Sequence, residues 1–533
     1  MRLARMGASH PTRLSFLRTL LRRMQAERWQ FDRPVWDLNA AGVGRAVYRA
    51  TGPDRTYSLV AFAHDLPADM RSDRVIATAW DATFALYDGT PDTADLDRLQ
   101  ANVPLQEAGR LSPRELTLSR ANRSVRLFDH VVDRLARGLQ PDADQIAATG
   151  YLMRTTAVYG SGKFGAADRA SVADRAELRA PFQAEMLTVW LIRAFTVDLV
   201  DHLAAARGGL AAVTLNPDLR RQLGVGNATG LGMAPFLIRH PTLLNNWMLV
   251  REEALARVRA QPMTTPATRA GFLAALHSAT ANADRWTSDH PVQTAKLADL
   301  RADLRKIAAR GVPDTAYPWN DLWLWAETAL TVEGQEALVA LMLEPHGPLI
   351  DGLSDCMDAD EAKAFHLDGA MPIAQVRADL AQHYPWAIGP DYSDKDQSAR
   401  FWYVSAEKLE PRLGDRYHEP GADLELPIDT GRRAAALADA LAPWDGDTPL
   451  AAFLLAHPDH RFMARRVQQA PRYPYAEIRD NLIAADTLPI DMLRCKLAFF
   501  GASRFDPRSD RWLRIALFQG QPYPDDLPTW PPL

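Results

Sequence analysis

Cysteine is nearly absent from this chain of 533 residues. Cys356 and Cys495 lie far apart in the sequence, and neither belongs to a CxxC pair. A disulfide framework and a cysteine zinc site both need more sulfur atoms than these two residues supply. This scarcity is typical of proteins from a reducing compartment, so we expect a cytoplasmic location.

Lysine is also scarce, with seven residues among the 61 basic side chains. Such a bias towards arginine is typical of a GC-rich bacterial genome. The net charge is −5, and acidic and basic residues are interspersed along the chain. Because a nucleic-acid-binding domain usually carries a basic surplus, we expect no nucleic-acid partner.

Long hydrophobic runs are missing as well, since no stretch approaches the roughly 20 uninterrupted apolar residues that span a bilayer. Apolar residues make up 47% of the chain and charged residues 24%, as in ordinary globular proteins. We therefore expect a soluble chain with no membrane partner, and its length predicts roughly two to four packed units. The oligomeric state is not indicated.

The first 28 residues are rich in arginine and contain a single acid. One interpretation is a detachable leader, because targeting peptides are rich in arginine and poor in acids. The other is a first helix packed on the body, because apolar residues recur at helical spacing. The spacing favours the packed helix, and the residues that carry it are Leu14, Leu17, Leu21 and Met24.

Residues 31–88 contain short β-type segments separated by Gly-Pro-Asp and Pro-Ala-Asp turns. Short strands joined by tight turns predict an antiparallel sheet. No helix of adequate length separates the strands, so a parallel dinucleotide-binding architecture is not expected. A last apolar alternation over 512–518 predicts a strand that could complete this N-terminal sheet.

From Thr93 onward, apolar residues recur at the spacing of a helix. Ser112 followed by Pro113 and Glu115 predicts a helix start, because this order supplies a cap, a first-turn proline and a capping-box glutamate. An apolar stripe from Ala121 to Leu135 predicts that this helix ends near Gly138.

The segment 181–203 is apolar on nearly every side and predicts a central helix, in which Arg193 with Asp198 or its neighbours would form internal ion pairs. Pro and Gly punctuate the chain beyond it. Further helices are predicted at about 240–260, 267–284, 293–310, 331–344, 373–383, 395–408, 430–442, 459–470 and 476–485.

These patterns predict a predominantly helical α+β fold. A small N-terminal antiparallel sheet is followed by a large helical body. The C-terminal strand could complete this sheet. Three parts are expected: residues 1–105 with the N-terminal helix and the antiparallel β portion, residues 106–345 with the helical body, and residues 346–533 with a C-terminal helical region whose last strand returns to the sheet.

Glycines, a hydroxyl group and a rare lysine are concentrated in the segment 151–165. Exposed amides and cationic groups hold anions, so Arg154 and Ser161 are candidates for substrate binding and Tyr159 and Lys163 for catalysis. The segment is not a P-loop, because a phenylalanine follows the lysine where Ser or Thr must ligate magnesium. The alternative is a structural turn that ends a helix.

A second glycine-rich segment, 224–236, has four glycines in nine residues. Glycines permit a close approach of the backbone to a ligand, and Asn227 and Thr229 could orient a substrate by hydrogen bonds. The GxGxxG spacing of dinucleotide-binding loops is missing. The alternative is a tight loop packed against a neighbouring helix.

Aromatic and charged residues alternate in a third segment, 400–412. Arg400, Lys408 and Arg412 could recognise a carboxylate or phosphate, and Tyr403 could donate a proton. The alternative is that the rings are core residues of a helix and that neighbouring glutamates neutralise the bases.

Motifs for metal or nucleophilic chemistry are lacking. His457 and His460 have HxxH spacing, but arginines crowd them and no HExxH is present. Ser161 stands in GSG rather than GxSxG. We therefore predict no metal and no cofactor, while a flavin or nucleotide in an unfamiliar cradle is not excluded.

The leading hypothesis is a cytosolic enzyme that acts on a small anionic metabolite by proton transfer, as a lyase or isomerase does, because this chemistry needs no motif that the sequence lacks. The alternatives are a non-catalytic helical scaffold or partner-binding protein, and a flavin- or nucleotide-binding oxidoreductase. The enzyme hypothesis predicts that the three segments converge on one cavity.

Replacing Lys163 by alanine tests the first of these segments. The variant should lose ligand binding with little change in folding, because an ammonium group in a loop contributes charge rather than core packing. Calorimetry with a ligand of the wild-type protein measures the affinity, and an unchanged affinity would count against a site at this segment.

Overall fold

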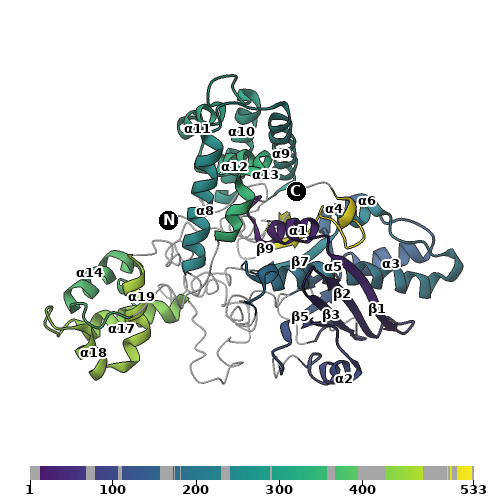
Figure 1. Cartoon of the computed structure of the whole chain (residues 1–533), viewed down its shortest axis with the longest axis horizontal. Coiled ribbons are helices and arrows are strands. Elements are labelled where there is room, and N and C mark those ends of the chain that lie inside the picture. Colours follow the sequence, from purple (N-terminus) through teal and green to yellow (C-terminus); the bar gives the residue numbers. More distant parts are fainter. Residues whose placement is uncertain are drawn as a thin grey trace.

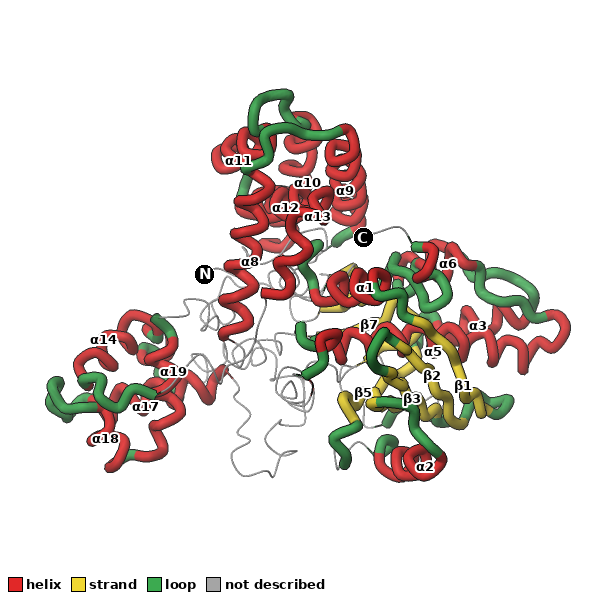
Figure 2. The backbone as a smooth tube through the Cα atoms, viewed as in Figure 1, coloured by secondary structure: helices red, strands yellow, loops and turns green. Residues whose placement is uncertain are grey.

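The computed structural model describes residues 12–67, 79–105, 111–155, 172, 174–180, 182–229, 241–287, 291–356, 367–393, 427–471, 501, 504–506 and 513–530. These residues form an α+β fold in which one sheet of nine strands contains segments from both ends of the sequence. In Figures 1 and 2, one group of helices lies above the sheet and a second group lies at the left of the view, away from the strands.

The first five strands form an antiparallel meander in which each pairs with the next. They are β1 (Gln30–Leu38), β2 (Gly44–Thr51), β3 (Thr56–Ala63), β4 (Ala82–Asp88) and β5 (Glu115–Arg123).

The predicted helix start at Ser112 is wrong, because Ser112 lies in a turn and strand β5 begins at Glu115. The Ser112 hydroxyl accepts a hydrogen bond from the Arg114 amide within a turn, 3.2 Å away. The buried Glu115 carboxylate is held by the Leu111 amide and by Arg98 instead of capping a helix. Only the later part of the stripe is helical, as α3 (Phe128–Ala136).

Four further strands extend the sheet. Strand β6 (Tyr151–Thr155) is antiparallel to β5, β7 (Gly224–Thr229) is parallel to β6, and β9 (Leu513–Leu517) is antiparallel to β7, with β8 (Arg504–Asp506) at the edge. The C-terminal strand therefore joins the sheet, although its partner is β7 and not a strand of the first hundred residues. The sheet is larger than the small N-terminal sheet that the sequence predicts.

Helix α5 (Gln183–Gly208) covers one face of the sheet, as Figure 1 shows. Its Phe195 ring contacts Phe84 of β4 at 5.4 Å between centroids, and its Thr188 hydroxyl lies 2.6 Å from that of Thr117 on β5. Helices α1 (Phe16–Ala26) and α3 also contact α5. The central helix is thus apolar on nearly every side because it has neighbours on nearly every side.

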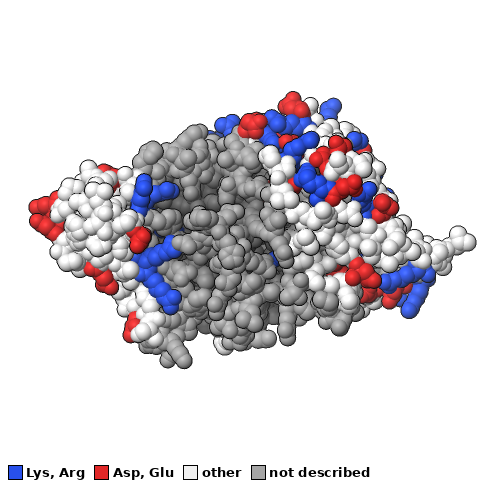
Figure 3. All heavy atoms as spheres, turned by 90° about the horizontal axis from the view of Figure 1, so that it is seen from below, with Lys and Arg blue, Asp and Glu red and all other residues white. Residues whose placement is uncertain are grey.

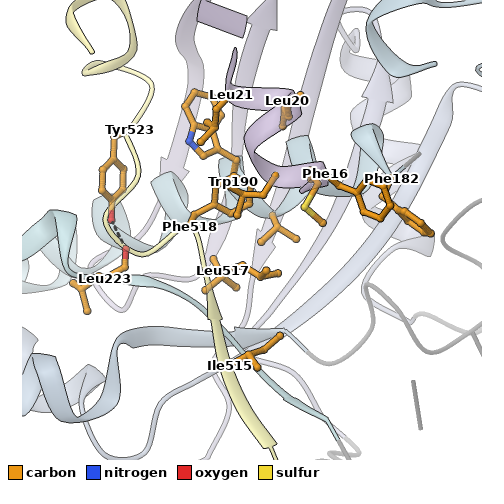
Figure 4. Packing of buried hydrophobic residues seen from close by; sticks show 14 of the residues in the cluster. Phe16, Leu20, Leu21, Phe182, Trp190, Leu223, Ile515, Leu517, Phe518 and Tyr523 are labelled. Carbon is orange, nitrogen blue, oxygen red and sulfur yellow. Dashed lines mark hydrogen bonds between the residues drawn. The ribbon is translucent and has the colours of Figure 1, made fainter. Parts of the chain in front are cut away.

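Helix α1 confirms the packed interpretation of residues 16–26. Its apolar side chains are buried, and Figure 4 shows Phe16, Leu20 and Leu21 converging with Trp190 of α5 and Leu517 of β9. Phe16 also contacts the Phe182 ring at 5.0 Å between centroids. The N-terminal helix, the central helix and the C-terminal strand therefore share one core.

The other face of the sheet is covered over part of its area by α2 (Thr93–Asn102). Leu96 and Leu99 of this helix pack on Val60, Phe62 and Leu118 of the sheet. Short helices complete this part of the chain: α4 (Ala143–Thr149), η4 (Ala176–Leu178), η5 (Gly209–Ala211) and α6 (Pro217–Arg221).

Residues 241–356 form a group of helices that we call the helical unit. The four helices predicted there are confirmed within about two residues, and the sequence pattern did not reveal α11 (Pro318–Ala329) or the short α13 (Gly347–Ile350). The buried Asp303 fixes the start of α12 by accepting hydrogen bonds from the Thr331 amide at 2.8 Å and its hydroxyl at 2.6 Å. The elements are α8 (Pro241–Arg259), α9 (Pro266–Arg285), α10 (Pro291–Arg310), α11 (Pro318–Ala329), α12 (Val332–Leu343), η7 (Glu344–His346), α13 (Gly347–Ile350) and η8 (Asp351–Cys356).

Residues 367–393 and 427–471 form a second helical group with a core of its own. Three predicted helices are confirmed here, whereas those at 395–408 and 476–485 lie outside the described residues. The elements are α14 (Ile373–His383), α15 (Pro385–Ile388), α17 (Pro427–Leu441), α18 (Leu450–Ala456), η11 (Pro458–His460) and α19 (Arg461–Gln469). Within the described residues, no helix is long and apolar enough to cross a membrane.

The predicted ion pair between Arg193 and Asp198 is wrong. The Asp198 carboxylate accepts hydrogen bonds from Tyr48 and Arg33 at the surface. The Arg193 guanidinium is buried and donates to four backbone carbonyls, and burial lowers its pKa to about 10. These carbonyls belong to Arg221 at 3.3 Å, Leu223 at 2.6 Å, Gln521 at 2.8 Å and Pro522 at 3.0 Å.

Tyr523 completes this arrangement. Its ring lies between two guanidinium groups, 3.7 Å from that of Arg193 and 4.0 Å from that of Arg220. Its hydroxyl donates to the Arg220 carbonyl at 3.1 Å, and the dashed line in Figure 4 marks its weaker contact with the Leu223 carbonyl. The segment after β9 is thereby fixed on the turn that precedes β7. The C-terminal segment ends with η12 (Leu527–Thr529).

Replacing Arg193 by methionine should lower the free energy of unfolding by about 3 kcal/mol or more, because several buried carbonyls would lose their donor. Chemical denaturation measures the change. Arg207 offers a matched control on the same helix, since it is partly exposed and pairs with Asp133 at the surface. Arg207→Met should cost less than about 1 kcal/mol, and equal losses in the two variants would contradict the role assigned to Arg193.

Candidate functional site

The face of the sheet opposite α5 changes from apolar to polar beyond α2. Directly opposed residues of antiparallel strands project their side chains to the same face. Phe62 opposes Thr83, which opposes Arg120. The next row on this face runs through His64, Asp81 and Asn122 to Arg154, which opposes Asn122 across β5 and β6. We call these four residues the polar row.

Asp81 and Asn122 hold the strand ends together. Asp81 is fully buried, and its carboxylate accepts a hydrogen bond from the Arg123 amide at 2.9 Å. The Asn122 side chain accepts from the Asp81 amide at 2.8 Å and donates to the Ala79 carbonyl at 3.1 Å. Burying a polar group costs free energy unless the group is hydrogen-bonded. The hydrogen bonds of Asp81 and Asn122 therefore hold this row in one specific arrangement.

His64 stands at the other end of the row, directly after β3. Its Nε2 lies 3.2 Å from the hydroxyl oxygen of the buried Thr83, and its amide donates to the Asp81 carbonyl. Burial lowers the pKa of His64, and the negative charge of Asp81 opposes this change. The imidazole is therefore neutral at pH 7 and able to accept a proton.

Arg154 is the only predicted site residue whose side chain the structure describes. It is buried, with 3% of its surface exposed, and lies in the middle of the sheet between β5 and β7. Gly226 is its partner on β7, and a Cβ atom there would fall 2.5 Å from the Tyr151 ring. The glycine thus lets β7 approach β6 closely. The sequence analysis expected the glycines to approach a ligand or to form a tight loop, whereas residues 224–229 form a strand.

The parallel pairing of β6 and β7 has a consequence for the two glycine-rich segments. Adjacent parallel strands have their carboxyl ends at the same edge, and ligands in open sheets bind beyond such ends. The first segment continues from β6 after Thr155, and the second from β7 after Thr229. Both segments therefore start from neighbouring positions, although nearly 70 residues separate these strands in the sequence.

The predicted residues can now be placed. Asn227 and Thr229 lie on β7, where their backbones pair with Ile515 and Leu513. The structure brings these two residues and Arg154 onto neighbouring strands. The other candidates lie outside the described residues, so their convergence with Arg154 stays a prediction: Tyr159, Ser161, Lys163, Arg400, Tyr403, Lys408 and Arg412.

The sequence interpretation missed Asp81, Thr83 and Asn122 as members of a common row. Each is a polar residue at a buried position of an otherwise apolar strand. The pattern of a single sequence cannot distinguish such a position from a solvent-facing position. The pairing register was needed to place them on one face.

Two further properties concern metal ligands and surface charge. Among the described residues, no group of three His, Cys, Asp or Glu side chains could hold a metal ion. In Figure 3, the described residues at the right of the view carry positive and negative side chains that are interspersed.

Comparisons with protein-family models, curated proteins and solved structures found no significant match to this chain. The polar row and strands β6 and β7 are therefore the features from which a function can be inferred.

Gly226→Ala tests the close approach of β7 to β6. The added methyl group would overlap the Tyr151 ring, so the variant should be destabilised by roughly 1–3 kcal/mol. Gly352 is the matched control, because its Cβ would meet nothing within 4 Å and its backbone is unstrained. Gly352→Ala should change stability by less than about 0.5 kcal/mol, and equal midpoints of thermal unfolding for the two variants would show that β7 has room for a side chain.

Proposed function

We propose that this chain is an enzyme that acts on a small metabolite bearing a carboxylate or phosphate, by proton transfer at the polar row. The observation that carries the proposal is the position of Arg154. A buried guanidinium lies on β6 beside β7, and each strand leads directly into a glycine-rich segment.

A buried arginine suits the recognition of an anion. Its planar group matches the geometry of carboxylate and phosphate oxygens and remains charged at any physiological pH. Its attraction for an anion is stronger than at the surface, because the effective dielectric constant is lower. In this proposal, backbone amides of the glycine-rich segments that follow β6 and β7 in the sequence bind the same anion.

Proton transfer is proposed because His64 is a neutral base at the other end of the row. Three strand spacings of about 4.8 Å separate the backbones of His64 and Arg154, roughly 14 Å in total. In this proposal Arg154 binds the anionic group and His64, or Tyr159 from the first glycine-rich segment, moves the proton.

Two variants of Arg154 test the proposal. A thermal-shift screen of carboxylates and phosphates, followed by calorimetry, should identify a ligand of the wild-type protein. Arg154→Lys should weaken its binding by roughly tenfold or more, because lysine loses bidentate geometry but retains charge. Arg154→Gln should abolish binding, whereas Arg207→Gln, at an exposed arginine on α5, should not change it.

The outcomes separate the alternatives. Binding that is equal in the wild-type protein and in Arg154→Gln would overturn the role of this residue. A complete lack of ligands in the screen would favour a non-catalytic scaffold. A stoichiometric chromophore in the purified wild-type protein, detected by absorbance and native mass spectrometry, would favour a flavin or nucleotide protein.

A further inference from the structure

A second arginine, Arg120 of β5, lies on the same face of the sheet as the polar row. Arg120 directly opposes Thr83 of β4, and Thr83 opposes Phe62, which packs against α2 on this face. Directly opposed residues of antiparallel strands project to one face, and so do residues two apart on a strand. Asn122, two residues after Arg120, opposes Arg154. Arg120 and Arg154 are therefore diagonal neighbours on adjacent strands.

This diagonal position sets the span between the two cationic side chains. The backbones of such neighbours lie roughly 7–8 Å apart, and long side chains reach across that distance. Asn122 stands beside both arginines, but its side chain bonds to the backbone, at the Asp81 amide and the Ala79 carbonyl. The two guanidinium groups can therefore bind different ends of one small molecule.

The Trp80 ring holds the Arg120 guanidinium in place. The guanidinium carbon lies 4.0 Å from the centroid of this ring, within the range of a cation–π contact. Such a contact uses no N–H donor, so the guanidinium can still donate hydrogen bonds to an anion. Both residues are half-buried. The cation is thus partly shielded from water, which strengthens its attraction for an anion.

The acid of the polar row serves a different arginine. The Asp81 carboxylate accepts a hydrogen bond from the Arg123 amide at 2.9 Å and lies 3.6 Å from the Arg123 Nε. Arg120 and Arg154 carry like charges on one face, and like charges repel each other more strongly where water is partly excluded. A ligand with one anionic group for each arginine would offset this repulsion.

We propose that the substrate carries two anionic groups, one bound by Arg154 and the other by Arg120. This inference rests on the proposed function, because it assigns a second contact of the same ligand. The substrate class is a dicarboxylate or a phosphorylated carboxylate with a short chain between its two charges.

The position of His64 fits a ligand held in this way. Its Nε2 lies 3.2 Å from the hydroxyl oxygen of Thr83, and Thr83 is the residue that opposes Arg120. Along the sheet, β3 is two strands from β5 and three strands from β6. The proposed base therefore stands closer to the group that Arg120 binds than to the group that Arg154 binds.

Matched ligands test the number of anionic groups. Glutarate is pentanoate with a carboxylate in place of the methyl group, and phosphoglycolate is ethyl phosphate with the same replacement. In calorimetry with the wild-type protein, the dianion of at least one pair should bind roughly 10- to 100-fold more tightly, as expected for one added charge-assisted contact. Equal affinities within both pairs, or no binding of any of the four, would overturn the proposal.

Variants assign the second contact. Arg120→Gln should lower the affinity for the dianion to that for its monoanionic partner and should leave the monoanion unchanged. Arg114→Gln is the matched control, because Arg114 lies over another ring, 4.7 Å from the centroid of Tyr87, directly before β5. It should change neither affinity.

The two arginines separate this inference from the proposed function. Binding that survives in Arg154→Gln would overturn the proposed function itself. A preference for the dianion that persists in Arg120→Gln would overturn only the second contact. Should Arg120→Gln fail to fold, Arg120→Lys keeps the charge and should weaken dianion binding by roughly tenfold. An unchanged dianion affinity in that variant would equally overturn the second contact.

Discussion

The fold depends on the hydrogen bonds that the Arg193 guanidinium donates to backbone carbonyls. One buried cation on the central helix satisfies carbonyls of the turn before β7 and of the segment after β9. A carboxylate could neutralise this charge but could not hold two chain segments at once. Carbonyl oxygens are partial charges with fixed directions, so the guanidinium fixes the position of both segments. The neighbouring ring of Tyr523 lies between two guanidinium groups and is itself fully buried.

This constraint links the architecture to the candidate site. Strand β7 is held at its start by the Arg193 contacts and along its length by β6 and β9. A strand fixed in this way presents the Gly226 backbone to Arg154 without freedom to slide. A shift of one residue would exchange the faces of the strand and would place a side chain against Tyr151.

The sequence predicts the helices well and the strand partners poorly. Helix boundaries such as those of α9 and α14 follow from local proline, threonine and apolar spacing, which one segment carries by itself. The partner of β9 follows from a register between distant residues, and β5 was read as a helix because Ser112 can cap a turn as well as a helix. For the site, glycine content indicated a close approach of the backbone but not that the neighbour of Gly226 is strand β6. The row from His64 to Arg154 is visible only through the pairing of four strands.

The pairing of β7 with β9 has a consequence for biosynthesis. Gly226 opposes Ala516, and 516 − 226 = 290 residues separate them. At about 5–20 residues per second, roughly 15–60 s of translation pass before β7 can receive this partner. During that interval the strand has one unpaired edge, and exposed edges recruit other chains. Glycine has a low β propensity, so the glycines of β7 make its unpaired edge a poor template for such association.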